Sequence, residues 1–296
     1  MRFNYFVKQL LIFYKNRIHL LLLVLLVLAT FPNYSQQQDL LKSLKVLVYD
    51  YDLKASPYGY RIGWYVFKLV PETYFKYAYF LLRLLITIPS FALLLFLFRC
   101  DEEKVLWISI ILLFLLMPVG HNFFGFYDAL ILLITELVIL FGSWKPIWTS
   151  LLVFVKESFL FPILTFGSPI SFIIGLLFYL IPRFIFRFQR LFAEGFLLRV
   201  FGFPIFNLNK NNFMVGLPSI LLLYLLIKKV FSPSKKFWVL FALYTIAVLI
   251  YGVPSEIRLF IFILPFLSME SQGIKHKRWI KRNKHRIGHK LVHVGK

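Results

Sequence analysis

Charged side chains inside long apolar stretches are the residues of this sequence best suited to chemistry. Asp128 lies near the start of one apolar stretch, and Lys156 and Glu157 lie together within another. Glu256 and Arg258 flank the turn between two later stretches. A charged group within lipid costs about 3 kcal/mol or more, so it usually faces a polar cavity or a partner of opposite charge. These residues are therefore the first candidates for a functional site.

Two further acids, Asp50 and Asp52, lie in the polar stretch that precedes residue 75. Carboxylates together with one or two cations in a membrane suit two kinds of chemistry. In a transport path they exchange protons or ions. In catalysis on a lipid-linked phosphorylated substrate, an Arg or Lys holds the phosphate while a carboxylate takes a proton from an acceptor hydroxyl.

Each of these residues also has a structural interpretation. Lys156 and Glu157 can neutralise each other, and Asp128 can hydrogen-bond between two helices. The late Glu–Arg pair and the two early acids can be ordinary groups of aqueous loops. Arg83 is interpreted as a snorkelling side chain or a structural partner. Glu136 is expected in the inner half of the membrane, away from the other acids.

The elements that must hold these residues are membrane helices. Hydrophobic residues make up 60% of the 296 positions, and Phe alone contributes 36, which is more apolar surface than a soluble domain of this size can bury. Because lipid satisfies no backbone amide, long apolar runs there must be helical. We predict an all-α membrane bundle of about 8–10 transmembrane helices over residues 1–269. The predicted spans are 18–32, 75–98, 105–119, 123–141, 145–166, 169–187, 214–230, 237–253 and 257–269, with 191–206 as a distorted span or an interfacial helix.

The net charge of +21 is concentrated in few places, since only 16% of the residues are charged. Nine Lys or Arg lie in the tail 270–296, and no acid follows Glu270. Directly after a membrane span, such a tail marks the cytoplasmic side and contacts anionic lipid headgroups. We therefore expect membrane lipids, and no nucleic acid, as its partners.

Basic residues also predict which side of the membrane each loop faces. Lys15 and Arg17 place the N-terminus in the cytoplasm of a multi-pass protein of the cytoplasmic (inner) membrane. The first loop, 33–74, is then external, and the tail 270–296 is cytoplasmic if 191–206 also crosses. In this scheme all the candidate acids except Glu136 lie at or near the external face, where they can share one polar cavity.

Short motifs in the same order resemble the GT-C class of multi-span glycosyltransferases, and especially its small bacterial members. The first external loop carries Tyr49-Asp50-Tyr51-Asp52, a D-x-D spacing where these enzymes have a catalytic Asp. It is followed by Pro57-Tyr58-Gly59-Tyr60-Arg61, which is similar to the P-Y-x-Y-R that opens their second span.

Three later segments extend the resemblance to residue 265. Phe126-Tyr127-Asp128 stands at the head of a span, and Val155-Lys156-Glu157-Ser158 resembles an R-E-[ST] motif with Lys in place of Arg. Ser255-Glu256-Ile257-Arg258-Leu259-Phe260 with Pro265 is similar to E-x-R-x-[FY] before a late proline.

The resemblance implies transfer of a sugar from a polyprenyl-phosphate donor to an acceptor at the external face. Asp50 or Asp52 would act as the general base, and Asp52 lies closer to the following span. Arg258 and Arg61 would hold the donor phosphate and offset the charge on the leaving group.

Glu157, Asp128 and Glu256 would shape the sugar pocket or orient these cations, whereas Lys156 lacks the bidentate grip of Arg. We predict no cofactor. A divalent metal is the one kind left open, and since the site is rich in carboxylates and poor in His, it would be an oxygen-ligated Mg²⁺ or Mn²⁺.

Other functions of a membrane bundle remain open. A transporter or lipid-linked glycan flippase should show paired halves with matching helix breakers, and we find no such symmetry. An oligosaccharide polymerase of the O-antigen type would carry its long external loop late in the chain, whereas here it comes first. In a non-catalytic assembly protein, Lys156 and Glu157 would form a structural pair.

Overall fold

The computed structural model of the chain describes residues 3–31, 69–116, 126–141, 153, 160–185, 210–251 and 257–268. Within these residues 89% are helical and none is in a strand, which confirms the predicted all-α class for this part of the chain. The predicted external loop 33–74 lies outside the described residues except at its end, and the basic tail 270–296 lies outside them entirely.

The N-terminal region forms two helices, α1 (Phe3–Tyr14) and α2 (Arg17–Ala29), whose axes differ by 91°. The sequence predicted a helix only over 18–32, so α1 was missed. The side chain of Asn16 accepts a hydrogen bond from the amide of Ile18 at 3.0 Å, which caps α2 and fixes the start of the second helix.

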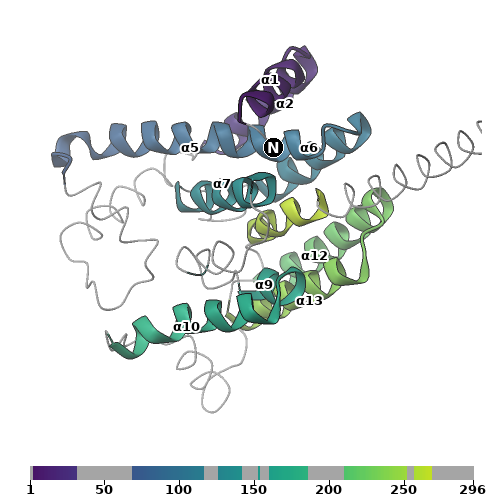
Figure 1. Cartoon of the computed structure of the whole chain (residues 1–296). Coiled ribbons are helices and arrows are strands. Elements are labelled where there is room, and N and C mark those ends of the chain that lie inside the picture. The colour runs from purple at the N-terminus through teal and green to yellow at the C-terminus, as the bar shows by residue number, and fades with distance from the viewer. Residues whose placement is uncertain are drawn as a thin grey trace, which may run out of the picture.

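Three helices follow in the middle of the chain: α5 (Phe75–Leu97), α6 (Glu102–Leu116) and α7 (Phe126–Phe141), with a short 3₁₀ turn, η2 (Glu72–Tyr74), before the first. Figure 1 shows α7 running along α5. The hydroxyl of Ser90 on α5 donates to the carbonyl of Ala129 on α7 at 2.7 Å. Pro89 precedes Ser90 inside α5 and removes one backbone hydrogen bond from that helix.

The later helices are α9 (Leu160–Phe166), α10 (Pro169–Ile185), α12 (Lys210–Phe231) and α13 (Lys235–Tyr251). They agree with the predicted spans 169–187, 214–230 and 237–253, and α9 is the described end of the span predicted at 145–166. Ser232, with φ of 43°, turns the chain between α12 and α13 (Figure 1), and the hydroxyl of Ser234 caps α13 by accepting from the amide of Lys236 at 3.2 Å.

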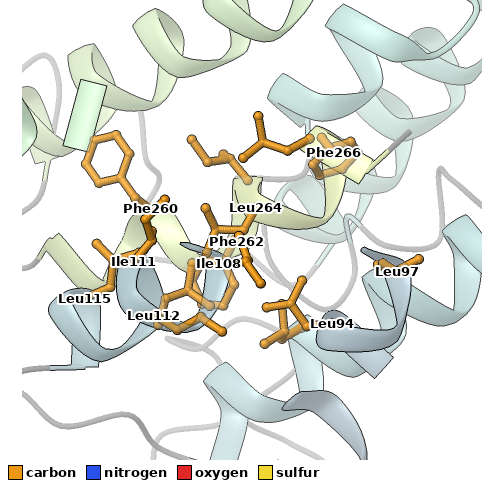
Figure 2. Close-up of a cluster of buried hydrophobic side chains, with 14 of the residues drawn as sticks. Leu94, Leu97, Ile108, Ile111, Leu112, Leu115, Phe260, Phe262, Leu264 and Phe266 are labelled. Carbon is orange, nitrogen blue, oxygen red and sulfur yellow. The ribbon is translucent and has the colours of Figure 1, made fainter. Parts of the chain in front are cut away.

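The most deeply buried segment is η4 (Ile257–Ile263), a 3₁₀ helix that continues as one helical turn to Ser268. The sequence predicted an ordinary α-helical span over 257–269, so its first half is corrected to the tighter 3₁₀ form. Every residue from Phe260 to Ser268 is buried, and η4 contacts α6, α7, α12 and α13. Figure 2 shows Phe260 and Phe262 packed among apolar side chains of α6.

Among the described residues, α5 is the one helix that is long and apolar enough to cross a membrane alone. The pair α1–α2 passes the same test only as a broken or re-entrant span. Helices α6, α7, α10 and α13 have 15, 16, 17 and 17 residues, or roughly 22–26 Å at the rise of an α-helix, against about 30 Å of hydrocarbon. The described helices thus show one clear span, and the count of 8–10 stays a prediction.

Candidate functional site

Between residues 77 and 90, the two faces of α5 have the opposite character from those of a helix in a soluble protein, whereas the buried residues from Phe91 to Leu97 are apolar. Its exposed face is a stripe of large apolar side chains with a spacing of three or four residues, Tyr77, Leu81, Leu85 and Ile88. Its buried face carries polar side chains at the same spacing, Tyr79, Arg83, Thr87 and Ser90. A helix in water would turn the first stripe inward and the second outward. This arrangement is the one expected of a helix that touches lipid on one side and polar partners on the other.

Arg83 is the most unusual residue of this buried stripe, because only 2% of it is exposed. Its guanidinium interacts electrostatically with Tyr79 on the preceding turn and with Asp128 on α7. The interpretation of Arg83 as a side chain that snorkels to the membrane surface is therefore wrong. The alternative, a partner inside the protein, is the arrangement that the structure contains.

Asp128 reaches this position because it lies in the first turn of α7, which packs along α5. Its residue is half-buried, and the unpaired amides at the start of a helix favour a negative charge there. The contact joins residues 45 positions apart, 83 and 128, so only the packing of the two helices brings them together.

A second buried acid, Glu136, lies two turns further along α7. Its residue is fully buried, and neither carboxylate oxygen has a hydrogen-bond partner within the described residues. It interacts electrostatically with Tyr14 of α1, whose hydroxyl donates to the carbonyl of Ala92 on α5 at 2.8 Å. Glu136 is thus separate from the Arg83–Asp128 pair, as the sequence predicted.

Most of the predicted site residues lie outside the described residues: Asp50, Asp52, Arg61, Lys156, Glu157 and Glu256. Whether they approach one another is therefore untested. Arg258 occupies the second position of η4, immediately before the segment that is buried on every side. Of the predicted set, the described structure gives the surroundings of Asp128, and it adds Arg83.

The described residues contain no group of three His, Cys, Asp or Glu that could hold a metal ion. Four of the predicted acids lie outside them, so this finding concerns only the helices seen here: Asp50, Asp52, Glu157 and Glu256.

Comparison with family models, curated proteins and solved structures gives no match to this chain. The resemblance to GT-C glycosyltransferases therefore rests on the short motifs alone. The function must be argued from the residues of the chain and their surroundings.

A buried guanidinium beside a carboxylate can do two things that bear on function. It can hold the carboxylate in one orientation, and it can offer its remaining N–H donors to a phosphate or carboxylate of a ligand. Arg83 is not among the site residues predicted from the sequence, although it lies within a long apolar run that forms the 23-residue helix α5. The signal was the spacing of Tyr79, Arg83, Thr87 and Ser90, which places all four on one face of a helix.

Proposed function

We propose that this protein is an integral membrane glycosyltransferase of the GT-C kind, which moves a sugar from a polyprenyl-phosphate donor to an acceptor at the external face of the cytoplasmic membrane. The observation that carries the proposal is the burial of Arg83 on α5, where it interacts electrostatically with Asp128 of the neighbouring helix α7. Asp128 belongs to one of the motifs that resemble this class of enzymes.

The packing of the two helices supports the proposal. The hydroxyl of Ser90 on α5 donates to the carbonyl of Ala129 in α7, next to Asp128, so the start of α7 packs on the polar stripe of α5. The topology predicted from basic residues runs both spans from the outside inward. In that topology the Arg83–Asp128 pair belongs to the outer half of the bilayer, where the transfer would occur.

In the proposed reaction, an acceptor hydroxyl attacks the anomeric carbon of the donor sugar. The bond between that carbon and the phosphate oxygen breaks, and polyprenyl phosphate leaves with the bonding electrons. Asp52 or Asp50 takes the acceptor proton, and Arg258 with Arg61 holds the phosphate as its charge grows. Asp128 then lies in the sugar pocket, and Arg83 fixes its carboxylate.

Residues 156, 157 and 256 complete the proposed pocket. Glu157 and Glu256 would accept hydrogen bonds from sugar hydroxyls or orient the cations, and Lys156 would add a point charge near the phosphate. No metal is required, because the two arginines offset the leaving-group charge.

The test is sugar transfer by the purified protein in nanodiscs with a panel of radiolabelled polyprenyl-phosphate sugars. We expect Asp52→Asn, Arg258→Ala and Asp128→Asn to lose at least tenfold in turnover, since removed catalytic groups typically cost that much or more. Glu103→Gln is the matched control, because Glu103 is exposed at the start of α6. The enzyme proposal fails if folded wild-type protein consumes no donor, or if the three variants keep the activity of the control.

Transport of protons or cations is a second candidate, and Glu136 is the observation that favours it. A buried carboxyl without a hydrogen-bond partner in the described helices is typical of residues that take up and release an ion. Proteoliposomes loaded with a pH-sensitive dye would report proton flux. Flux that is present in the wild type and lost in Glu136→Gln would favour transport over transfer.

A further inference from the structure

The chain bends sharply between α1 and α2, and the residues at the bend explain why. The two helices meet at 91°, and Asn16 both ends the first and caps the second by accepting from the amide of Ile18 at 3.0 Å. The exposed face of α2 is apolar, with Ile18, Leu21 and Leu28 all more than half exposed. If α2 enters the bilayer along the membrane normal with this face in lipid, α1, at 91° to it, must lie in the plane of the membrane.

The depth of α1 follows from its contacts with α5. The rings of Phe6 and Phe13 pack edge-on against Phe96, with centroids 5.5 and 5.8 Å apart. Phe96 lies in the last turn of α5, which ends at Leu97, and exposed Cys100 follows four residues after Phe96. The helix α1 therefore lies at the level where α5 leaves the apolar layer.

The face of α1 that points away from Phe96 is both apolar and basic. Leu11, Ile12 and Tyr5 are 63%, 49% and 57% exposed, and Lys8 and Lys15 are exposed among them. A surface that carries both groups can place its lysines at the lipid headgroups and its apolar side chains at the top of the acyl chains.

The charge of this surface is one-sided. Arg17 follows at the start of α2, and no acid occurs in the chain before Asp39. At the start of α6, Asp101 pairs with Lys104 at 3.4 Å, and Glu102 and Glu103 are exposed. Within the described helices, Lys8, Lys15 and Arg17 form no ion pair. Three basic groups at the membrane surface thus face outward.

We propose that α1 lies in the headgroup layer of the membrane and that Lys8, Lys15 and Arg17 bind the phosphates of anionic phospholipids. Leu11 and Ile12 then reach into the upper acyl region. A re-entrant α1 would instead carry Lys8 into the hydrocarbon, which is strongly unfavourable for an unpaired lysine. This inference needs α2 to be in the membrane and is independent of the proposed sugar transfer.

Spin-label depth measurements test the position of α1. In a Cys100→Ser background, single cysteines replace Lys8, Leu11 and, as a deep reference, Leu25 of α2, which lies roughly 12 Å beyond Arg17 along the helix; the protein is placed in nanodiscs of phosphatidylcholine and phosphatidylglycerol. We expect the label at 11 to lie just below the headgroups, the label at 8 in the aqueous layer and the label at 25 deep. Equal depths at 8 and 25 would show a re-entrant helix, and full water exposure at both 8 and 11 would show a cytosolic one; either result overturns the proposal.

Lipid affinity tests the basic residues separately. Binding of a fluorescent phosphatidylglycerol to the protein in neutral detergent should weaken roughly fivefold for each of Lys8→Gln, Lys15→Gln and Arg17→Gln. The matched control is Lys76→Gln, an exposed lysine at the opposite end of α5. Equal weakening by the control variant, or no weakening by the three variants, contradicts a specific phosphate-binding surface on α1.

Discussion

Arg83 and Asp128 are charged groups on neighbouring helices, one buried in the polar stripe of α5 and one half-buried in the first turn of α7. Arg83 is 2% exposed and interacts electrostatically with Asp128, while Tyr79 approaches it from its own helix. Removing one partner of a buried pair leaves an uncompensated charge, which costs more than the pair itself contributes. The pair should therefore behave as one unit in mutagenesis.

We predict that Arg83→Met lowers the free energy of unfolding by about 1 kcal/mol, because half-buried Asp128 then loses the electrostatic attraction of Arg83. The double variant Arg83→Met/Asp128→Leu should be more stable than Arg83→Met alone. Denaturation by sodium dodecyl sulfate, followed by circular dichroism, measures both. Lys76→Met, which removes an exposed cation at the start of α5, is the control. Strictly additive effects of the two substitutions would show that the residues do not interact.

Glu136 leads to the opposite prediction, since its carboxylate has no hydrogen-bond partner in the described part of the chain. Replacing an unsatisfied buried polar group by an apolar one of similar size is neutral or stabilising. We expect Glu136→Leu to leave the free energy of unfolding unchanged or to raise it by about 1 kcal/mol. A loss of more than about 2 kcal/mol in the same denaturation assay would mean that the carboxyl makes an essential interaction.

At the scale of elements, the turn between α12 and α13 contains one serine with an unfavourable backbone conformation and one serine that stabilises the next helix. Ser232 has φ of 43°, in the left-handed region that glycine adopts without steric cost. Ser234 caps α13 through hydrogen bonds from the amides of Lys236 and Phe237 at 3.2 and 3.5 Å.

We predict that Ser232→Gly raises the free energy of unfolding by about 0.5–1 kcal/mol, because it relieves the left-handed conformation of a residue with a side chain. Ser234→Ala should lower it by about 1 kcal/mol through loss of the cap. The midpoints of thermal unfolding in detergent should thus move in opposite directions. A shift of both variants in the same direction would contradict this account of the turn.

Helices could be predicted from the sequence wherever it contains a long apolar run. A long apolar run in lipid must be helical, so the helices at 75–97 and 210–251 followed from composition. The helix α1 was missed because Lys8 and Lys15 interrupt its apolar pattern, and only packing on Phe96 shows its buried face. The 3₁₀ form of η4 was also missed, since it depends on surrounding helices that enclose it completely.

The candidate site was predictable in residue type but not in pairing. Asp128 stood out in the sequence because it lies inside an apolar run. A charged residue there usually faces a partner or a polar cavity. That its partner is Arg83 could not be predicted, because it depends on which two helices are neighbours. The sequence contains many helix pairs of similar character, and the Ser90–Ala129 hydrogen bond selects one of them.

For the whole molecule, the central question is which solvent surrounds it. Figure 1 shows helices arranged side by side, and the exposed stripe of α5 consists of large apolar residues. Leu85 is 60% exposed at the middle of this 23-residue helix. In water, an exposed leucine replaced by lysine would change the free energy of unfolding by less than about 0.5 kcal/mol. In lipid, the same lysine would cost about 3 kcal/mol at the centre of a span.

We therefore predict that Leu85→Lys sharply reduces the amount of folded protein recovered from the membrane fraction, whereas Leu85→Ala has a small effect. Glu103→Lys introduces the same charge at an exposed position outside the apolar run and should be tolerated. The measurement is the folded fraction by size-exclusion chromatography of a fluorescent fusion after detergent extraction. Unchanged recovery of Leu85→Lys would mean that this face of α5 touches water, and the membrane function proposed above would lose its basis. Recovery that falls only for Leu85→Lys would place α5 in lipid, with its polar stripe as the inner wall of the site.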